Sequence, residues 1–208
     1  MSNVTIFKHP LINHKMKTIR DENTDAKEFS TLLSEVAMLM TYEVTKDLRT
    51  KTVYVKTPVA DAKCEVLDTQ IVLVPILRAG LGFLEGFQKL MDNVEVGFIG
   101  MARDEKTHQP VGYFTKLPPL EHKVVYVLDP MLATGGSACD AIAKLKAHGA
   151  TKIAYIGLVG AQEGIDKIQN NHPDVDIYLA NLDNSLNENA YIVPGLGDCG
   201  DRLFGKTN

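Results

Sequence analysis

One segment near the middle of the chain combines residue types that could bind a phosphorylated sugar. The apolar run 124–128 ends at Asp129, and a loop of small residues, Thr134–Ser137, follows it. Backbone N–H groups of such a loop can point at a phosphate, the start of a helix favours an anion, and the Thr134 and Ser137 hydroxyls add donors. The Asp129 carboxylate could accept hydrogen bonds from two sugar hydroxyls. A helix-capping turn explains the loop alone equally well, so the segment needs support from the rest of the chain.

Two glycine patterns resemble a dinucleotide-binding loop and are set aside. The run 195–200 matches G-x-G-x-x-G, but Pro194 precedes it and the eight residues after it are too few for the crossover helix and strand of that fold. The run 80–86 follows an apolar stretch, but its spacing is one residue too long. No G-x-x-x-x-G-K-[S/T] sequence occurs, so a P-loop nucleotide site is not supported.

Five apolar runs predict the strands that would position this segment. They are Ile71–Leu77, Val94–Met101, Val124–Leu128, Ile153–Val159 and Val175–Ala180. Runs that are apolar throughout, with helical segments between them, are typical of parallel strands covered on both faces. The helices expected between and after them cover Leu81–Met91, Ser137–His148 and Gln162–Asn170. An earlier amphipathic helix should run from a cap at Asp25 to Leu48.

The other segments predict a hairpin and a flap. Residues 52–57 and 64–67 flank a break at Pro58, which indicates a short β-hairpin. Residues 103–120 are polar and contain three prolines, so they are expected to form a flap or a hairpin arm. We therefore expect an α/β fold in a single domain over residues 1–208, with a central, mostly parallel five-stranded sheet and helices on both faces. Ligands of such sheets bind at the carboxyl ends of the strands, where Asp129 would lie.

The composition limits the classes of function. The 208 residues carry a formal net charge of −4, which argues against a nucleic-acid partner because phosphates call for a basic face. The one basic stretch, Lys8–Arg20, is interpreted as a solvated face. Apolar runs long enough for a membrane helix or a secretory signal are lacking. Three widely spaced cysteines, and six histidines without ligand spacing, predict neither a disulfide framework nor a zinc site, and a cytoplasmic protein is expected.

The segment 129–137, Asp-Pro-Met-Leu-Ala-Thr-Gly-Gly-Ser, resembles the phosphoribosyltransferase signature, in which a strand ends in an acid and leads into a small loop that holds a 5′-phosphate. Most members of that superfamily have two adjacent acids. Here Leu128 precedes Asp129 and Pro130 follows it, a form that resembles the uracil phosphoribosyltransferase branch. Further segments similar to that branch are His9–Leu11, Val74–Gly82, Gly100–Glu105 and Tyr191–Asp201. The resemblance therefore spans essentially the whole chain.

This resemblance implies a role for each matching residue. Arg78 and Arg103 would bind the diphosphate group, and a C-terminal hood at about 183–208 would close over the base. The ribose phosphate would lie against Asp129, Pro130, Met131, Leu132, Ala133, Thr134, Gly135, Gly136 and Ser137. Uracil would be held by Ile192, Gly197, Asp198 and Cys199. Asp198 would also face the phosphoribosyl substrate through magnesium-bound water, so the metal would have no direct protein ligand. The residues expected to act in catalysis are Arg78, Arg103, Asp129 and Asp198.

Physical arguments agree with these roles. Both arginines follow predicted strands, and guanidinium forks match phosphate oxygens. Uracil alternates carbonyl and N–H groups along its edge, and a glycine-rich loop such as 191–201 can pair with them through its main chain. Two positions depart from the pattern: Cys199 stands where relatives commonly have alanine, and Ala102 where they commonly have tyrosine. The first puts a larger group beside the base, and the second could alter how the flap closes or how tightly diphosphate is held.

The implied activity joins uracil to 5-phosphoribosyl 1-diphosphate and gives UMP and diphosphate. Substrate-bound Mg²⁺, a homodimer or higher assembly and, as in some bacterial members, activation by GTP are further implications of the resemblance. The partners would be small molecules rather than nucleic acid or a membrane. One alternative is an RNA-binding regulator of pyrimidine genes that keeps the fold, which would need a basic face. Another is a catalytically silent sensor that binds the diphosphate substrate but forms no UMP.

Overall fold

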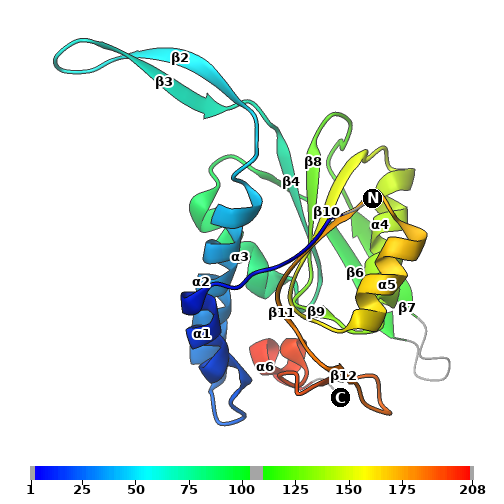
Figure 1. The fold of residues 1–208 in the computed structure, drawn as a ribbon. Helices are drawn as coiled ribbons and strands as arrows, with labels where there is room; N and C mark the ends of the chain where they lie inside the picture. The colour runs from blue at the N-terminus through cyan, green and yellow to red at the C-terminus, as the bar shows by residue number, and fades with distance from the viewer. Residues whose placement is uncertain (1–2, 104–109, 207–208) are drawn as a thin grey trace.

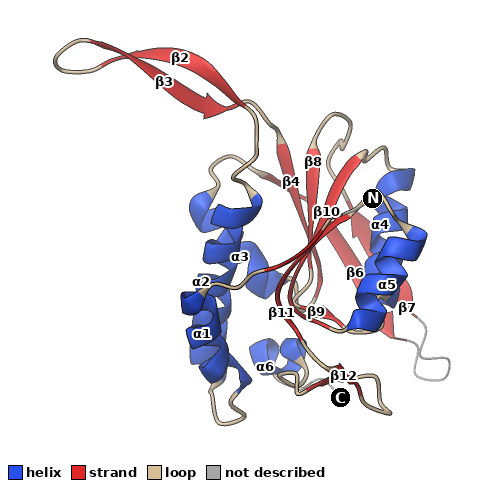
Figure 2. Cartoon of the chain, viewed as in Figure 1, coloured by secondary structure: helices blue, strands red, loops and turns tan. Residues whose placement is uncertain are grey.

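A large, mostly parallel sheet forms the centre of the computed structural model, which describes residues 3–103 and 110–206 (Figures 1 and 2). The strand order is β1-β11-β10-β8-β4-β6-β7, and each neighbouring pair is parallel except β6 and β7. The strands on this path are β1 (Val4–Ile6), β4 (Ile71–Leu77), β6 (Phe98–Arg103), β7 (Pro110–Lys116), β8 (Val124–Leu128), β10 (Lys152–Gly160) and β11 (Asp176–Leu182). Two short strands, β5 (Glu95–Val96) and β9 (Met131–Leu132), add to β4 and β10. The α/β fold predicted from the sequence is confirmed.

The five predicted strands form the middle of this sheet, but the prediction was incomplete at both edges. Strand β1 has three residues, and β7 mixes apolar residues with Pro110, Gly112 and Lys116, so neither has the long apolar pattern of a central strand. The expected strand Val94–Met101 is also divided at Gly97 into β5 and β6, although the Gly97 N–H still donates to the Leu73 carbonyl of β4 at 2.9 Å.

Helices cover both faces of the sheet, as predicted. On one face pack α1 (Pro10–Arg20), α2 (Ala26–Val44) and α3 (Leu81–Leu90), and on the other α4 (Gly136–Ala147) and α5 (Gln162–Asn171) (Figure 1). The short α6 (Cys199–Phe204) lies near the carboxyl end of the chain. Phe29, Phe83 and Phe87 fill the core of the first face with no exposed surface, and Ile142 and Leu145 do so on the second. Burial of these side chains holds the layers together.

The first two helices differ from the sequence-based expectation. The basic stretch 8–20 is not simply a solvated face, because α1 buries Ile12, Met16 and Ile19, and its Arg20 pairs with the buried Asp183. The Asp25 carboxylate caps α2 by accepting from the N–H of Glu28 at 2.8 Å, as predicted. That helix ends at Val44 instead of Leu48, where the Thr45 hydroxyl donates to the Thr41 carbonyl at 2.7 Å.

A two-stranded antiparallel hairpin, β2 (Thr50–Lys56) and β3 (Asp61–Leu67), projects away from the body of the molecule (Figure 1). The sequence predicted this hairpin, with slightly shorter strands. Its side chains are mostly exposed, including Tyr54 at 74% and Val59 at 94%.

The predicted flap begins where β6 ends at Arg103, and β7 returns antiparallel to it. Residues 104–109, between the two strands, lie outside the described residues, as does the side chain of Arg103. In the described part of the chain, none of the helices combines the length and the apolar character needed to cross a membrane.

Candidate active site

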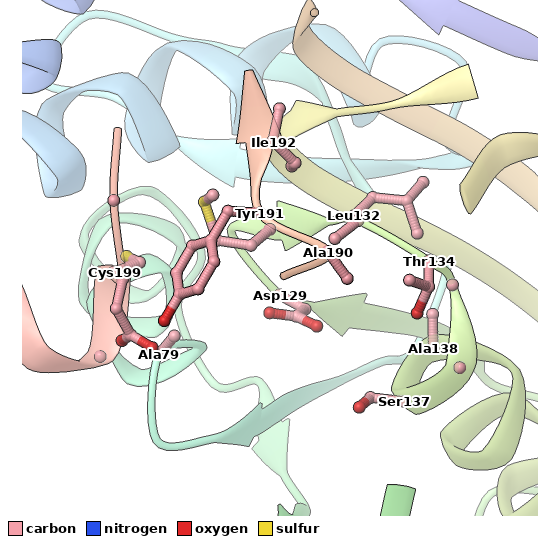
Figure 3. A pocket seen from close by; sticks show the side chains of 17 residues that line it. Ala79, Asp129, Leu132, Thr134, Ser137, Ala138, Ala190, Tyr191, Ile192 and Cys199 are labelled. Carbon is pink, nitrogen blue, oxygen red and sulfur yellow. The ribbon is translucent and has the colours of Figure 1, made fainter. Parts of the chain in front are cut away.

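The connection from β8 to α4 forms one wall of a cavity at the carboxyl edge of the sheet. We call residues 129–138 the α4 wall. The backbone of Asp129 is fixed on both sides, because its N–H donates to the Ile156 carbonyl at 3.1 Å and its carbonyl accepts from the Tyr155 hydroxyl at 3.0 Å. The side chain of Asp129 is left to face the cavity (Figure 3).

The loop after Asp129 is held against the neighbouring strand and helix. The Pro130 carbonyl accepts from the N–H groups of Leu158 and Val159, each at 2.9 Å, and the Leu132 carbonyl accepts from Ala161 at 2.9 Å. Because these carbonyls bond toward β10 and α5, the loop is fixed without any contribution from a ligand.

The start of α4 is open to the cavity. Gly135 precedes the helix with φ +74°, and a Cβ there would lie 2.8 Å from the Gly164 carbonyl oxygen, so the position requires glycine. No side chain caps this end. The first N–H groups of a helix have no partner within it, and together with the helix dipole they favour an anion. The Thr134 and Ser137 hydroxyls lie beside this opening (Figure 3).

The cavity has a volume of about 370 Å³. Its lining residues are Ala79, Asp129, Met131–Ala138, Ala190–Ile192 and Gly197–Gly200. Asp129 lies between the hydroxyls of the α4 wall on one side and Tyr191 and Cys199 on the other (Figure 3). A volume of this size is at the lower end of the range for small-molecule sites.

The Asp129 carboxyl has a strongly shifted pKa. Its side chain remains partly accessible through the cavity, but protein atoms enclose it on the other sides. This burial raises the pKa of Asp129 from 3.8 to about 7, although a hydrogen bond from the Met131 backbone acts in the opposite direction. The carboxyl group is therefore poised to lose its proton when a ligand supplies hydrogen-bond donors.

Residues 190–200 form the opposite side of the cavity, which we call the α6 wall. It starts with β13 (Ile192–Val193), which pairs antiparallel with β12 (Ser185–Leu186), and it ends in the first turn of α6. Asp198 caps that helix by accepting from the N–H of Asp201 at 2.8 Å. Cys199 is 1% exposed, and burial, with a smaller effect of the nearby Asp129, raises the pKa of its thiol. The thiol is therefore a neutral group at physiological pH.

Arg78 lies at the border of the cavity. Its guanidinium forms an ion pair with Asp201 at 2.9 Å. The guanidinium also lies beside Gly200, because a Cβ added to that glycine would be 3.5 Å from the nearest guanidinium nitrogen. Ala79, the next residue, lines the cavity. The turn that carries both is close-packed, because a Cβ on Gly80 would lie 2.4 Å from the Leu128 carbonyl oxygen at the end of β8.

The residues singled out from the sequence are largely brought together. Asp129, Met131–Ser137 and the four residues expected near the base line the cavity. Pro130 does not, since its carbonyl bonds to β10, and Arg78 borders it. The Arg103 side chain lies outside the described residues. Sequence reasoning missed Ala79, Ala138, Ala190, Tyr191 and Gly200 as lining residues. All of these except Ala190 are direct sequence neighbours of predicted site residues, so their position in the chain could have identified them.

Within residues 3–103 and 110–206, no three His, Cys, Asp or Glu side chains gather in a group that could hold a metal ion.

Comparison with protein families gives one match over nearly the whole chain. The model of the family described as uracil phosphoribosyltransferase matches residues 6–206. The chain is 55% identical over 207 residues to the uracil phosphoribosyltransferase of Clostridium acetobutylicum, covering 99% of both sequences. It is 52% identical over 206 residues to that of Acholeplasma laidlawii, again with 99% of both covered.

Solved structures support the same fold. A protein from Aquifex aeolicus superposes with a TM-score of 0.94 at 39% identity, covering 98% of this chain and 99% of that one. A hypoxanthine-guanine phosphoribosyltransferase from Bacillus anthracis has a TM-score of 0.51 at 12% identity, with 74% and 78% of the two chains covered. At that identity, the second similarity concerns the fold alone.

Proposed function

Because the chain belongs to the uracil phosphoribosyltransferase family, we propose that the cavity between the α4 and α6 walls is where uracil and 5-phosphoribosyl 1-diphosphate react to give UMP and diphosphate. The observation that carries this proposal is the sharing of one cavity by three kinds of group. These are the open start of α4, the Asp129 carboxyl and the glycine-containing loop before α6. They suit a phosphate, a ribose and a base, in that order across the cavity.

The α4 wall would bind the ribose 5-phosphate. The phosphate would lie at the start of α4, where backbone N–H groups and the hydroxyls of Thr134 and Ser137 supply donors. The ribose hydroxyls would donate to Asp129. Because such hydrogen bonds favour the ionised carboxyl, binding would lower the pKa of Asp129 from its raised value of about 7.

The α6 wall would bind uracil. Gly197 has φ +81°, and nothing lies within 4 Å of the place where a Cβ would stand, so a planar ring can approach the main chain there. The base would lie against Ile192 and the neutral thiol of Cys199, and main-chain groups near Asp198 would pair with its carbonyl and N–H edge.

The proposed reaction is a displacement at the anomeric carbon of the ribose. The bond from uracil N1 to C1′ forms as the bond from C1′ to the diphosphate oxygen breaks. Diphosphate leaves with the electron pair, and the N1 proton passes to solvent. Arg78 and Arg103 would stabilise the charge of the leaving group, and alignment of the base by the α6 wall would supply much of the acceleration.

The carboxylates of Asp129 and Asp198 line the same cavity, and oxygen ligands of this kind fit Mg²⁺ that arrives on the diphosphate and is held through water. When bound, the ion would stabilise negative charge on the leaving diphosphate.

Further proposals concern the setting of the enzyme. We propose one domain over residues 1–208, with a flap at 103–120, a hood at 183–208 and a homodimer or higher assembly. The assembly is supported by the β2–β3 hairpin, since an isolated two-stranded hairpin with exposed Tyr54 and Val59 is marginally stable in water. Light scattering during size-exclusion chromatography tests this assembly.

The free thiols of Cys64, Cys139 and Cys199 support a cytoplasmic location. Activation by GTP rests on family resemblance and is tested by rates with and without it.

The deciding experiment supplies purified protein with 5-phosphoribosyl 1-diphosphate, Mg²⁺ and, separately, uracil, cytosine, orotate, hypoxanthine or adenine. We expect diphosphate release and UMP with uracil. A product with a purine alone would contradict the proposed substrate. Binding of the diphosphate substrate without any nucleotide product would indicate a sensor instead of an enzyme.

A further inference from the structure

The α6 wall is attached to the rest of the protein by a cluster of charged and main-chain groups behind the cavity. Asp183 follows β11 and is buried, with 5% of its side chain exposed. One carboxylate oxygen accepts from Arg20 at 2.7 Å, and the other accepts from the second guanidinium nitrogen of Arg20 at 2.7 Å and from the Gly195 N–H at 2.9 Å. Arg20 lies in the last turn of α1.

Both main-chain groups of Gly195 are held by this pair. While its N–H donates to Asp183, its carbonyl accepts from Arg20 at 2.7 Å. Gly195 also has φ +62°, and a Cβ there would lie 2.1 Å from the Ile192 carbonyl oxygen, so no other residue fits. Arg20 and Asp183 therefore fix the orientation of the two peptide units on either side of Gly195, two residues before Gly197 of the cavity.

A second arginine attaches the next residue to the same helix. Arg202 on α6 donates to the Leu196 carbonyl at 3.0 Å and to the Ile19 carbonyl at 2.5 Å, and its other nitrogen donates to the Asp21 carbonyl at 2.6 Å. Its guanidinium stacks over the Phe29 ring at 4.2 Å. The end of α1 is thus joined to the α6 wall at two consecutive residues, 195 and 196.

We infer that Arg20 and Asp183 are positioning residues for the base: they do not line the cavity, but they fix the main-chain groups at 197–199 that meet uracil. This inference rests on the proposed function of the α6 wall. Buried, bidentate arginine–carboxylate pairs impose a geometry that a single charged group cannot. The basic stretch at the start of the chain thereby gains a role that its composition did not indicate.

The test compares the Michaelis constants for the two substrates in Arg20→Met. A displacement of the wall by about 1 Å should raise the KM for uracil roughly 10- to 100-fold. The KM for 5-phosphoribosyl 1-diphosphate should stay within about threefold, because the α4 wall is held by its own bonds to β10 and α5. Arg20→Lys keeps the charge but loses the fork, so its KM for uracil should lie between those of wild type and Arg20→Met.

A matched control separates positioning from general loss of stability. Lys123 is 10% exposed and pairs with Glu95 at 2.5 Å, at the opposite end of β8 from Asp129. Lys123→Met should lower the melting temperature and leave both KM values unchanged. If Arg20→Met does not fold, Asp183→Asn takes its place, since it retains an oxygen for the Gly195 N–H and should raise the KM for uracil by a smaller factor.

The inference is overturned if folded Arg20→Met binds uracil with the wild-type KM, or if both KM values rise by the same factor. Cys199→Leu distinguishes this failure from that of the proposed base site. If Cys199→Leu raises the KM for uracil while Arg20→Met does not, the positioning role alone is wrong. If neither variant changes the KM for uracil, uracil does not bind at the α6 wall.

Discussion

The α4 wall and the α6 wall of the cavity differ in what holds them. The α4 wall is a single stretch, 129–138, that follows a central strand directly and bonds to the two elements next to it in the fold. The α6 wall lies beyond the end of the sheet and depends on side chains of Arg20 and Arg202. A strand-to-helix turn on a buried sheet needs few external contacts, whereas an irregular segment outside the sheet must be fixed by specific ones.

This difference predicts that substitutions in the two walls will act on different kinetic constants. Changes in the α4 wall should act on phosphoribosyl binding and turnover together, while changes behind the α6 wall should act mainly on the base. Substitutions of Asp129, Arg78 and Cys199 test that division.

Asp129→Ala should reduce kcat about a hundredfold or more while the fold is retained, because the ribose would lose the acceptor that orients it. Steady-state kinetics with circular dichroism as a check on folding measures this. Turnover at the wild-type rate would remove Asp129 from the mechanism.

Arg78→Ala should slow the reaction by about a hundredfold, because it removes a charge that we propose stabilises the leaving diphosphate. Arg78 also forms an ion pair with Asp201, and more than a third of the arginine side chain is exposed to solvent. Because exposed ion pairs contribute little, the loss in unfolding free energy should be below about 1 kcal/mol. Steady-state kinetics at varied concentrations of 5-phosphoribosyl 1-diphosphate measures the loss of rate. Chemical denaturation measures the loss of stability. A large loss of stability with little change in rate would make Arg78 a structural residue.

Cys199→Leu should raise the KM for uracil about tenfold, since the added carbon atoms extend into the space for the base. Cys199→Ala, which only enlarges the cavity, is the matched control and should stay close to wild type. The opposite order of the two variants would mean that the thiol contacts the base favourably.

Asp129→Asn should stabilise the ligand-free protein, with an effect that grows between about pH 4 and pH 7. In that window the carboxyl ionises readily in the unfolded chain, where its pKa is near 3.8, but holds its proton in the folded protein, where it is about 7. The wild-type protein therefore loses stability as pH rises, by at most about 4 kcal/mol. Urea denaturation of the wild-type protein and of Asp129→Asn at pH 5 and pH 8 measures this. If the difference in unfolding free energy between the two proteins is the same at both pH values, the pKa of Asp129 is near normal.

The α4 wall could be predicted from the sequence because its strand, its acid and its glycines are contiguous, and strand-to-helix turns follow local rules. The residues of the α6 wall could be named from motif resemblance. The residues that hold this wall in place could not. Arg20 is 163 residues from Asp183 and 175 from Gly195 in the chain, and no local pattern links them. The edge strand β1 was missed for a related reason, since pairing to an existing sheet, not apolar periodicity, makes it a strand. Strand β7 lies in the segment expected to form a flap or a hairpin arm, and it pairs antiparallel with β6. The relatives described above carry the name of the enzyme, and nothing in them supports the RNA-binding alternative.

The contact between Arg202 and the Ile19 carbonyl spans 183 residues of sequence. During synthesis, strand β8 and the turn after it can be complete long before Arg202 has been added to the chain. The α6 wall, which we propose binds the base, can therefore be fixed in place only after Arg202 has been synthesised, later than the α4 wall. A chain that ended before residue 190 would contain the residues of the α4 wall but none of the α6 wall.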